Sequence, residues 1–278
     1  MRVAPVGCGL GAEISGIDMA RLDHGAFTEI RRAFLDHLVL FFRDQRLGPE
    51  QQVALTRRFG PVLRVPYVAH LQEHPDVVAV LKEAGEQQIS TFGNAWHSDF
   101  SFLEEPPAGS LLYALEVPPH GGDTLWANMY TAYETLSEGM RRMLDGFKAI
   151  HTGTPYGARG GVGIRGSRSI KITRGDPEAD REIAHPVVRT HPESGRKALF
   201  VNAIYTTRFE GMTEAESRPL LDFLFQHCTQ PEFACRFRWS PGALAIWDNR
   251  CTLHYAVNDY DGRRRLLHRT TFAGERPI

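Results

Sequence analysis

Cysteine is scarce in this sequence of 278 residues. No two cysteines form a C-x-x-C pair, and their spacing gives no dense disulfide framework. We therefore expect reduced thiols and a cytoplasmic protein. The four cysteines are Cys8, Cys228, Cys235 and Cys251.

Long apolar runs and an excess of one charge are also missing. No stretch approaches the length of a transmembrane helix, and Met1–Pro5 lacks the apolar run of a signal peptide. The net charge of −1 argues against a general binder of nucleic acid or membrane surfaces. We see no repeat, no low-complexity tail and no composition break. The composition, 42% hydrophobic and 23% charged, fits one globular domain over residues 1–278.

The spacing of apolar residues predicts strands around a pocket with helices packed outside, an α+β plan. Pro49 stands near the start of one expected helix and Gly60-Pro61 at its end. Thr213 and Glu216 form a capping box for another. Helices are expected at 23–37, 49–60, 133–144 and 213–225, and strands at 39–42, 77–81, 110–117, 187–190, 198–201, 233–239, 243–247 and 264–272.

Residues 152–182 have a different character from the rest. Residues 152–168 contain six glycines and three arginines with almost no periodicity, and 174–181 is highly charged. A loop of this length inside a compact domain is usually functional or disordered. We interpret it as a lid over a site, with a plain surface excursion as the alternative.

The triplet His97-Ser98-Asp99 is the first candidate for chemistry. Aromatic residues on both sides predict a strand over 94–102. Alternate side chains of a strand share a face, so His97 and Asp99 can reach one ion such as Fe(II), Mn or Zn. A polar pair at a strand end is the alternative. A second triplet, His74-Pro75-Asp76, favours a turn or a strand end because of its proline.

His254 is the best candidate for a third ligand, because it follows a strand and a polar turn. Ten residues later the expected strand 264–272 places alternate arginines on one face. Guanidinium groups beside a metal site favour anionic ligands, because arginine binds carboxylates through a fork of paired hydrogen bonds. We assign this role to Arg265 and Arg269, and we interpret Arg263 and Arg264 as solvated.

These motifs together resemble the taurine dioxygenase-like (TauD/TfdA) family of Fe(II)- and 2-oxoglutarate-dependent dioxygenases. The resemblance spans nearly the whole chain and implies a double-stranded β-helix (jelly-roll) core with flanking helices. The matching segments are 11–16, 96–99, 106–108, 121–126, 185–192, 246–250, 254–256 and 268–269.

The resemblance implies a role for each matching residue. His97, Asp99 and His254 would bind Fe(II), and Arg265 with Thr124 would bind the distal carboxylate of 2-oxoglutarate. Arg269 matches the arginine that holds the anionic group of the primary substrate. O2 is then consumed as 2-oxoglutarate is decarboxylated to succinate and CO2 and the substrate is hydroxylated. The related halogenases lack the carboxylate, so Asp99 disfavours that chemistry.

Three departures from the taurine enzymes concern the substrate. Val65 and Val68 stand where those enzymes carry a histidine and a tyrosine, and Gly93 replaces an expected asparagine. These substitutions favour a more apolar substrate body than taurine. Segments 129–133 and 211–217 look closer to the aryloxyalkanoate dioxygenases of the same family. The predicted substrate is thus a small aryloxyalkanoate- or sulfonate-like anion, with a taurine or alkylsulfonate desulfonating dioxygenase as the alternative.

Two other classes of protein stay open from the residues alone. A zinc hydrolase could use the same His/Asp/His set, but it would not need Arg265 and Thr124 for a second carboxylate ligand. A non-catalytic anion-binding jelly roll would not need an intact triad. We expect a small anionic substrate as the partner, no nucleic acid, no membrane, and a homo-oligomer (dimer or tetramer).

Overall fold

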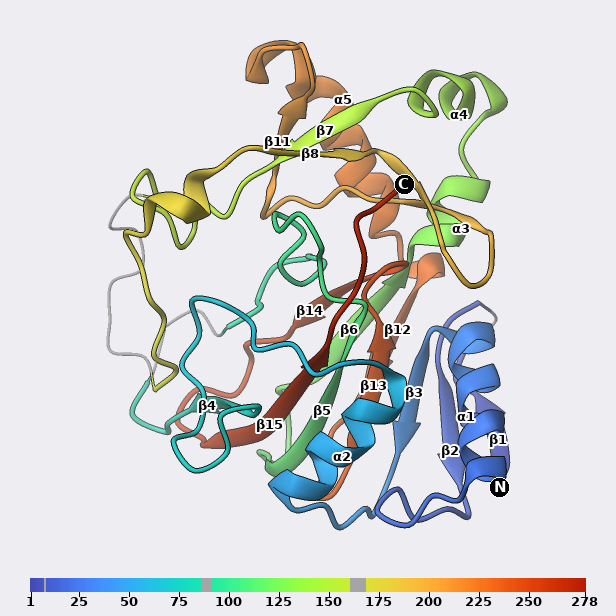
Figure 1. Ribbon diagram of the computed structural model, residues 1–278, viewed down its shortest axis with the longest axis vertical. Coiled ribbons are helices and arrows are strands. Elements are labelled where there is room, and N and C mark those ends of the chain that lie inside the picture. The colour runs from blue at the N-terminus through green and yellow to red at the C-terminus, as the bar shows by residue number, and fades with distance from the viewer. Residues whose placement is uncertain (8, 87–91, 161–168) are drawn as a thin grey trace.

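A seven-stranded sheet forms one side of the core in the computed structural model, which describes residues 1–7, 9–86, 92–160 and 169–278 (Figure 1). The strand order is β1-β2-β3-β13-β5-β15-β4. Every residue of β13, in the middle of the sheet, is buried. The strands are β1 Arg2–Pro5, β2 Ala12–Ser15, β3 Val39–Phe42, β4 Val78–Lys82, β5 Gly109–Glu116, β13 Leu244–Asp248 and β15 Arg265–Phe272.

A three-stranded sheet packs against one face of this large sheet. It contains β6 Thr124–Asn128, β12 Ala234–Phe237 and β14 Thr252–Ala256 in the order β12-β6-β14. Phe41 of β3 stacks on Phe237 of β12 with ring centroids 4.2 Å apart. Trp126 of β6 packs on Trp247 of β13 in the same core. The two facing sheets confirm the predicted jelly roll.

Two helices cover the other face of the large sheet. Helix α1 His24–His37 packs against β3 and β13, and α2 Pro49–Phe59 packs against β5 and β15 (Figure 1). The side chain of Asp23 caps α1 by accepting a hydrogen bond from the Ala26 amide. Both helices match their predicted positions. Within the described residues, no helix is long and apolar enough to cross a membrane.

The remaining elements lie beside the smaller sheet, at the top of Figure 1. The predicted capping box is present, because the Thr213 hydroxyl accepts from the Glu216 amide and the Glu216 carboxylate accepts from the Thr213 amide. The elements are helices α3 Met129–Glu134, α4 Glu138–Leu144 and α5 Glu214–Cys228, the 3-10 helices η1 Pro177–Asp180 and η2 Pro231–Phe233, and strands β7 Lys148–His151, β8 Ile183–Pro186, β9 Val188–Thr190, β10 Lys197–Leu199 and β11 Thr206–Phe209.

The single helix predicted over 133–144 is wrong. Helix α3 ends at Glu134 and α4 starts at Glu138. Ser137 explains the break, because its hydroxyl accepts a hydrogen bond from the Met140 amide and thereby caps a new helix. The periodicity of a single helix would place Met143 with the buried Leu136 and Leu144, but Met143 is 41% exposed on α4.

Candidate metal centre

Three polar side chains from two distant segments meet beside the middle of β14. His97 pairs with His254 as an isolated β-bridge, in which each amide donates to the carbonyl of the other residue, at 3.1 and 2.8 Å. The Asp99 Oδ1 atom lies 3.6 Å from His97 Nε2 and 3.7 Å from His254 Nε2. All three side chains are buried. The structure therefore brings together the three residues that the sequence nominated as metal ligands.

The strand predicted over 94–102 is wrong, but the side chains of His97 and Asp99 still come together, as that strand was expected to bring them. His97 makes only the single bridge, and the chain turns over 99–102. The turn begins beside Asp99, since Phe100 has a φ of 47°, in the left-handed region that a strand cannot contain. The side chains of His97 and Asp99 still converge, because the bridge fixes the first and the turn directs the second.

The protonation states of His254 and Asp99 suit a divalent cation. The His97 Nδ1–H donates to the Ala95 carbonyl at 2.7 Å, so Nε2 is the ring nitrogen that faces Asp99. Burial and the neighbouring His97 lower the pKa of His254 well below its ordinary value, so that imidazole is neutral. Burial alone raises the pKa of Asp99, but the Arg269 guanidinium, 2.9 Å from its carboxylate, outweighs burial and holds that pKa well below its usual range. Neutral imidazoles and an ionised carboxylate are the ligand forms.

Arg265 and Thr124 lie in a pocket that opens beside the two histidines. Arg265 is buried, and its Nε atom has no hydrogen-bond partner among the described residues. The Thr124 hydroxyl accepts from Trp239 Nε1 at 3.0 Å, which leaves its own hydrogen to donate. A buried guanidinium of this kind needs an anion. The pocket is lined by Val80, Phe92, Gly93, His97, Leu112, Thr124, Trp247, His254, Ala256, Arg265 and Arg269.

Arg269 joins this pocket to the triad. Its Nη2 atom lies 2.9 Å from Asp99 Oδ2, and it shares the buried face of β15 with Arg265 and Leu267. By contrast, Arg263 is exposed, and Arg264 forms ion pairs with two glutamates near the surface. The structure thus confirms that two arginines of this strand point inward and two do not.

The three departures from the taurine enzymes, Val65, Val68 and Gly93, occupy two places in the structure. Gly93 lines the pocket with a φ of 80°, and a Cβ atom there would lie 3.2 Å from His97 Cε1. A larger residue at this position would crowd the imidazole. Val65 and Val68 are buried in a hydrophobic cluster beside the triad, outside the pocket lining. The structure does not bring these valines together with Gly93.

Sequence reasoning missed the aromatic members of that cluster. These are Phe100, which follows Asp99 directly in the chain, with Phe102, Tyr156 and Tyr205. The ring of Tyr205 packs edge-on to His97, and its hydroxyl lies 3.3 Å from that of Tyr156. Burial raises the pKa of Tyr205 well above its ordinary value, so this hydroxyl stays protonated. The aromatics flanking Asp99 were visible in the sequence, but nothing there placed Tyr156 and Tyr205 with them.

A second group, His191, Asp248 and Cys251, also has ligand atoms close together. His191 Nε2 donates to Asp248 Oδ2 at 3.0 Å, and its Nδ1 accepts from two backbone amides. Both oxygens of Asp248 also accept from Arg250. The lone pairs that a metal would need are therefore already used, and we interpret this group as structural.

Comparison with known proteins agrees with this geometry. Residues 2–271 match the family described as "Taurine catabolism dioxygenase TauD, TfdA family". An alkylsulfatase from Acinetobacter baylyi is 36% identical, with 96% of this chain and 83% of the relative covered. The alpha-ketoglutarate-dependent 2,4-dichlorophenoxyacetate dioxygenase of Cupriavidus pinatubonensis is 37% identical, with 94% and 93% covered. The crystal structure of a taurine dioxygenase from Burkholderia xenovorans superposes with a TM-score of 0.83 at 36% identity, covering 100% of this chain and 92% of the other.

The match covers almost the whole chain, and both relatives are aligned over most of their own length. The cofactors of the family are Fe(II), 2-oxoglutarate and O2. A buried His/Asp/His cluster beside a buried arginine whose Nε atom has no hydrogen-bond partner among the described residues is the donor set that these cofactors require. The chain therefore belongs to the TauD/TfdA family and is a 2-oxoglutarate-dependent dioxygenase.

Proposed function

We propose that this enzyme hydroxylates a small organic anion with an apolar body, such as an aryloxyalkanoate, sulfate ester or sulfonate. The reaction is coupled to decarboxylation of 2-oxoglutarate to succinate and CO2. The observation that carries the proposal is the pair Arg265 and Arg269, two buried cations on one strand face beside the triad. Two cations allow two anions to be bound, one from the cosubstrate and one from the substrate.

In this proposal each residue of the site has one task. His97, Asp99 and His254 hold Fe(II), which with 2-oxoglutarate and O2 supplies the oxidant when bound. Arg265 and the Thr124 hydroxyl bind the distal carboxylate of 2-oxoglutarate. Arg269 binds the anionic group of the substrate. It pairs with Asp99 here, and a cation held by that carboxylate weakens this pair and leaves the guanidinium to the substrate.

The surroundings of the triad favour an apolar substrate body. Val65 and Val68 pack with the aromatic cluster, and Gly93 offers no side chain to bind the ammonium group of taurine. The relatives act on a dichlorophenoxyacetate and, by name, on alkyl sulfates, both anions with an apolar part. A taurine or alkylsulfonate desulfonating enzyme is the second candidate, because Gly93 cannot bind the ammonium group of taurine. A zinc hydrolase is disfavoured, because it leaves Arg265 without a partner.

A substrate panel tests this function. Aryloxyacetates, aryloxypropionate enantiomers, alkyl sulfates, alkylsulfonates and taurine are compared by succinate formation and O2 uptake with Fe(II) and 2-oxoglutarate. We expect at least one apolar anion to exceed taurine by about tenfold or more in kcat/KM, because an apolar pocket discriminates by 1–3 kcal/mol. Methyl esters of the carboxylates serve as uncharged controls.

Four outcomes would contradict the proposal. Taurine as the best substrate would favour the second candidate. Equal activity on the uncharged esters would remove the anion requirement. Product release without O2 would favour a hydrolase, and no turnover on any compound would favour an anion-binding protein.

We also propose that the segment 152–182 acts as a lid, of which residues 152–160 and 169–182 are described. Residues 161–168, with Arg165 and Arg168, lie outside the described residues. Tyr156 supports the proposal, because its ring is buried in the aromatic cluster and stacks on Tyr67 with centroids 5.2 Å apart. Ile172 forms a β-bridge with Val68. The segment thus touches the residues around the triad from both of its described parts.

Amide hydrogen exchange tests the lid. We expect peptides from 152–160 and 169–182 to exchange more slowly once metal, 2-oxoglutarate and substrate are bound, because a cover over the oxidising site excludes water. Peptides from α1 serve as the control, since that helix lies on the opposite side of the large sheet. Equal exchange of the lid peptides in the empty and loaded enzyme would reduce the segment to a surface loop.

A cytoplasmic location and a homo-oligomer (dimer or tetramer) stay predictions. Three buried cysteines without disulfides, Cys228, Cys235 and Cys251, support a reducing compartment. The family resemblance alone supports the oligomer.

A further inference from the structure

Asn249, in the turn between β13 and β14, binds the backbone of the residue that carries the metal-binding carboxylate. Its Oδ1 atom accepts from the Asp99 amide at 2.7 Å, and its Nδ2 donates to the Asp99 carbonyl at 3.0 Å. A further Nδ2 bond reaches the Pro107 carbonyl at 3.0 Å, and the Ser98 hydroxyl donates to the Asn249 carbonyl. Asn249 is 1% exposed. Its amide therefore occupies both backbone groups of Asp99, as a neighbouring strand would.

The hydrogen bonds from Asn249 support a part of the chain that has no strand partners. Residues 99–102 form a turn without strand partners, and Phe100 has an uncommon positive φ. Asp99 must nevertheless hold its carboxylate between His97 and His254 and against the Arg269 guanidinium. In the described structure, the side-chain bonds of Asn249 are what tie the backbone of Asp99 to the rest of the core.

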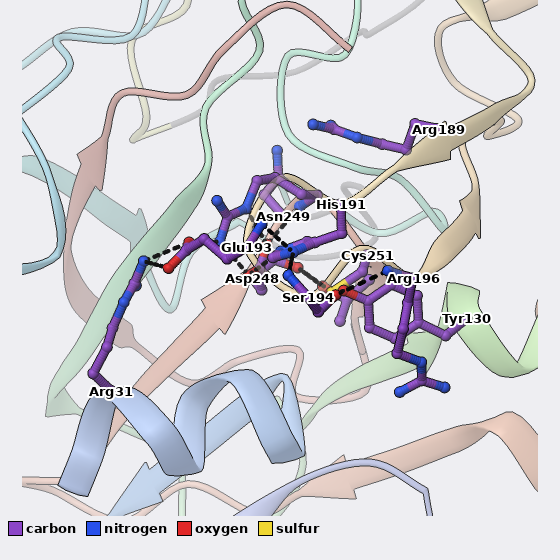
Figure 2. A network of polar contacts seen from close by, with 12 residues as sticks. Arg31, Tyr130, Arg189, His191, Glu193, Ser194, Arg196, Asp248, Asn249 and Cys251 are labelled. Atoms are coloured by element: carbon purple, nitrogen blue, oxygen red, sulfur yellow. Dashed lines mark hydrogen bonds and ion pairs between the residues drawn. The ribbon is translucent and has the colours of Figure 1, made fainter. Parts of the chain in front are cut away.

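A network of charged groups, buried at His191, Asp248 and Arg250 and nearer the surface at Glu193 and Arg31, holds the turn that presents Asn249 (Figure 2). Asp248 accepts from Arg250 and from His191, as described above, and Arg250 Nη2 also lies 2.8 Å from Glu193 Oε1. Figure 2 shows Glu193 lying between this turn and Arg31 of α1, whose Nη2 is 2.5 Å from the same oxygen. The network joins α1, the 191–196 turn and the β13–β14 turn, and these contacts hold the turn that carries Asn249 in place.

We propose that Asn249 is a positioning residue that sets the place of the Asp99 carboxylate and thereby the affinity of the site for its metal. The inference rests on the proposed role of Asp99 as an iron ligand. Removing a residue that hydrogen-bonds to a metal ligand typically weakens metal affinity 10- to 100-fold. Asn249 differs from such groups because it binds the backbone of Asp99 and not the Asp99 carboxylate.

The test is a metal titration of the apoprotein, with Co(II) and with anaerobic Fe(II) as probes and no catalysis involved. We expect Asn249→Ala to raise the metal dissociation constant by about 10- to 100-fold. Asn128→Ala is the matched control, because Asn128 is 3% exposed and its amide also bonds three backbone groups, those of Gly9, Tyr130 and Thr131. We expect it to lower the melting temperature but to leave the metal dissociation constant within about twofold of the wild type.

Asn249→Asp is a second variant, used in case Asn249→Ala fails to fold. It keeps the volume of the side chain and the oxygen that accepts from the Asp99 amide. It places an oxygen where Nδ2 donated, so it should also weaken metal binding. Amide exchange of a peptide spanning 97–103 should rise in both Asn249 variants and not in Asn128→Ala. Metal affinity within twofold of wild type in the Asn249 variants would overturn the inference, as would an equal loss in Asn128→Ala. Unchanged metal binding in Asp99→Ala would instead reject the proposed triad.

Discussion

Asp99→Ala is expected to lose all succinate formation that depends on the primary substrate while it keeps the fold. The carboxylate is the single anionic group of the triad, and its Oδ1 lies 3.6 and 3.7 Å from the two imidazole Nε2 atoms. Without it the two imidazoles remain beside the Arg269 guanidinium with no anionic ligand, and a divalent cation is repelled from that site. The measurements are succinate formation, metal content and far-UV circular dichroism.

The other His-x-Asp triplet supplies the control for this variant. Asp76 lies near the surface and pairs with Arg64 at 2.7 Å and with Arg57 at 3.5 Å. Asp76→Ala should keep wild-type activity and metal content, because surface ion pairs contribute at most about 1 kcal/mol. Full activity in Asp99→Ala, or in metal-stripped protein, would contradict the role of Asp99 as an iron ligand.

Replacing Arg265 or Arg269 by alanine should weaken the binding of two different molecules. Arg265→Ala should mainly raise the KM for 2-oxoglutarate, because it removes the cation beside the Thr124 hydroxyl. Arg269→Ala should mainly raise the KM for the primary substrate. Losing a charge-assisted pair in a desolvated pocket costs about 2–4 kcal/mol, or about 30- to 1,000-fold in KM. Steady-state kinetics with each substrate varied in turn separates the two effects.

Arg264→Ala is the matched control, at the position directly before the same strand. Arg264 points away from the pocket and pairs with Glu83 and Glu116, so its loss should change neither KM by more than about twofold. If the two inward arginines exchange their effects, the assignment of cosubstrate and substrate on β15 is reversed. Arg269→Ala also removes the ion pair with Asp99, so its metal content is measured beside the kinetics.

The sequence alone indicated the core strands and the two helices that cover the large sheet. Helices α1 and α2 were predictable because local signals agree there: apolar spacing of 3.6 residues, Asp23 or Pro49 at the start, and Gly60 after the second helix. The inward face of β15 was predictable for the same reason, since period-2 alternation places Arg265 and Arg269 together. The break before α4 was missed, because a single serine cap decided it.

The stretch around Asp99 shows where local signals fail. Its aromatic and polar alternation is typical of a strand, but strand structure requires a partner, and here only His97 finds one. The turn at Phe100 and the two hydrogen bonds from Asn249 then fix Asp99. Those bonds join residues 150 positions apart, so no local pattern could indicate them.

The sequence by itself determined which side chains are available for the chemistry and which elements carry them. His97, Asp99, His254, Arg265 and Arg269 were nominated by type and spacing and by the family they resemble. Only the tertiary structure decided that they meet, that Val65 and Val68 stand apart from Gly93, and that Tyr156 and Tyr205 join the site. The physical reason is that helix and strand periodicities act over a few residues, whereas the metal centre is assembled by sheet pairing and side-chain packing between segments more than a hundred residues apart.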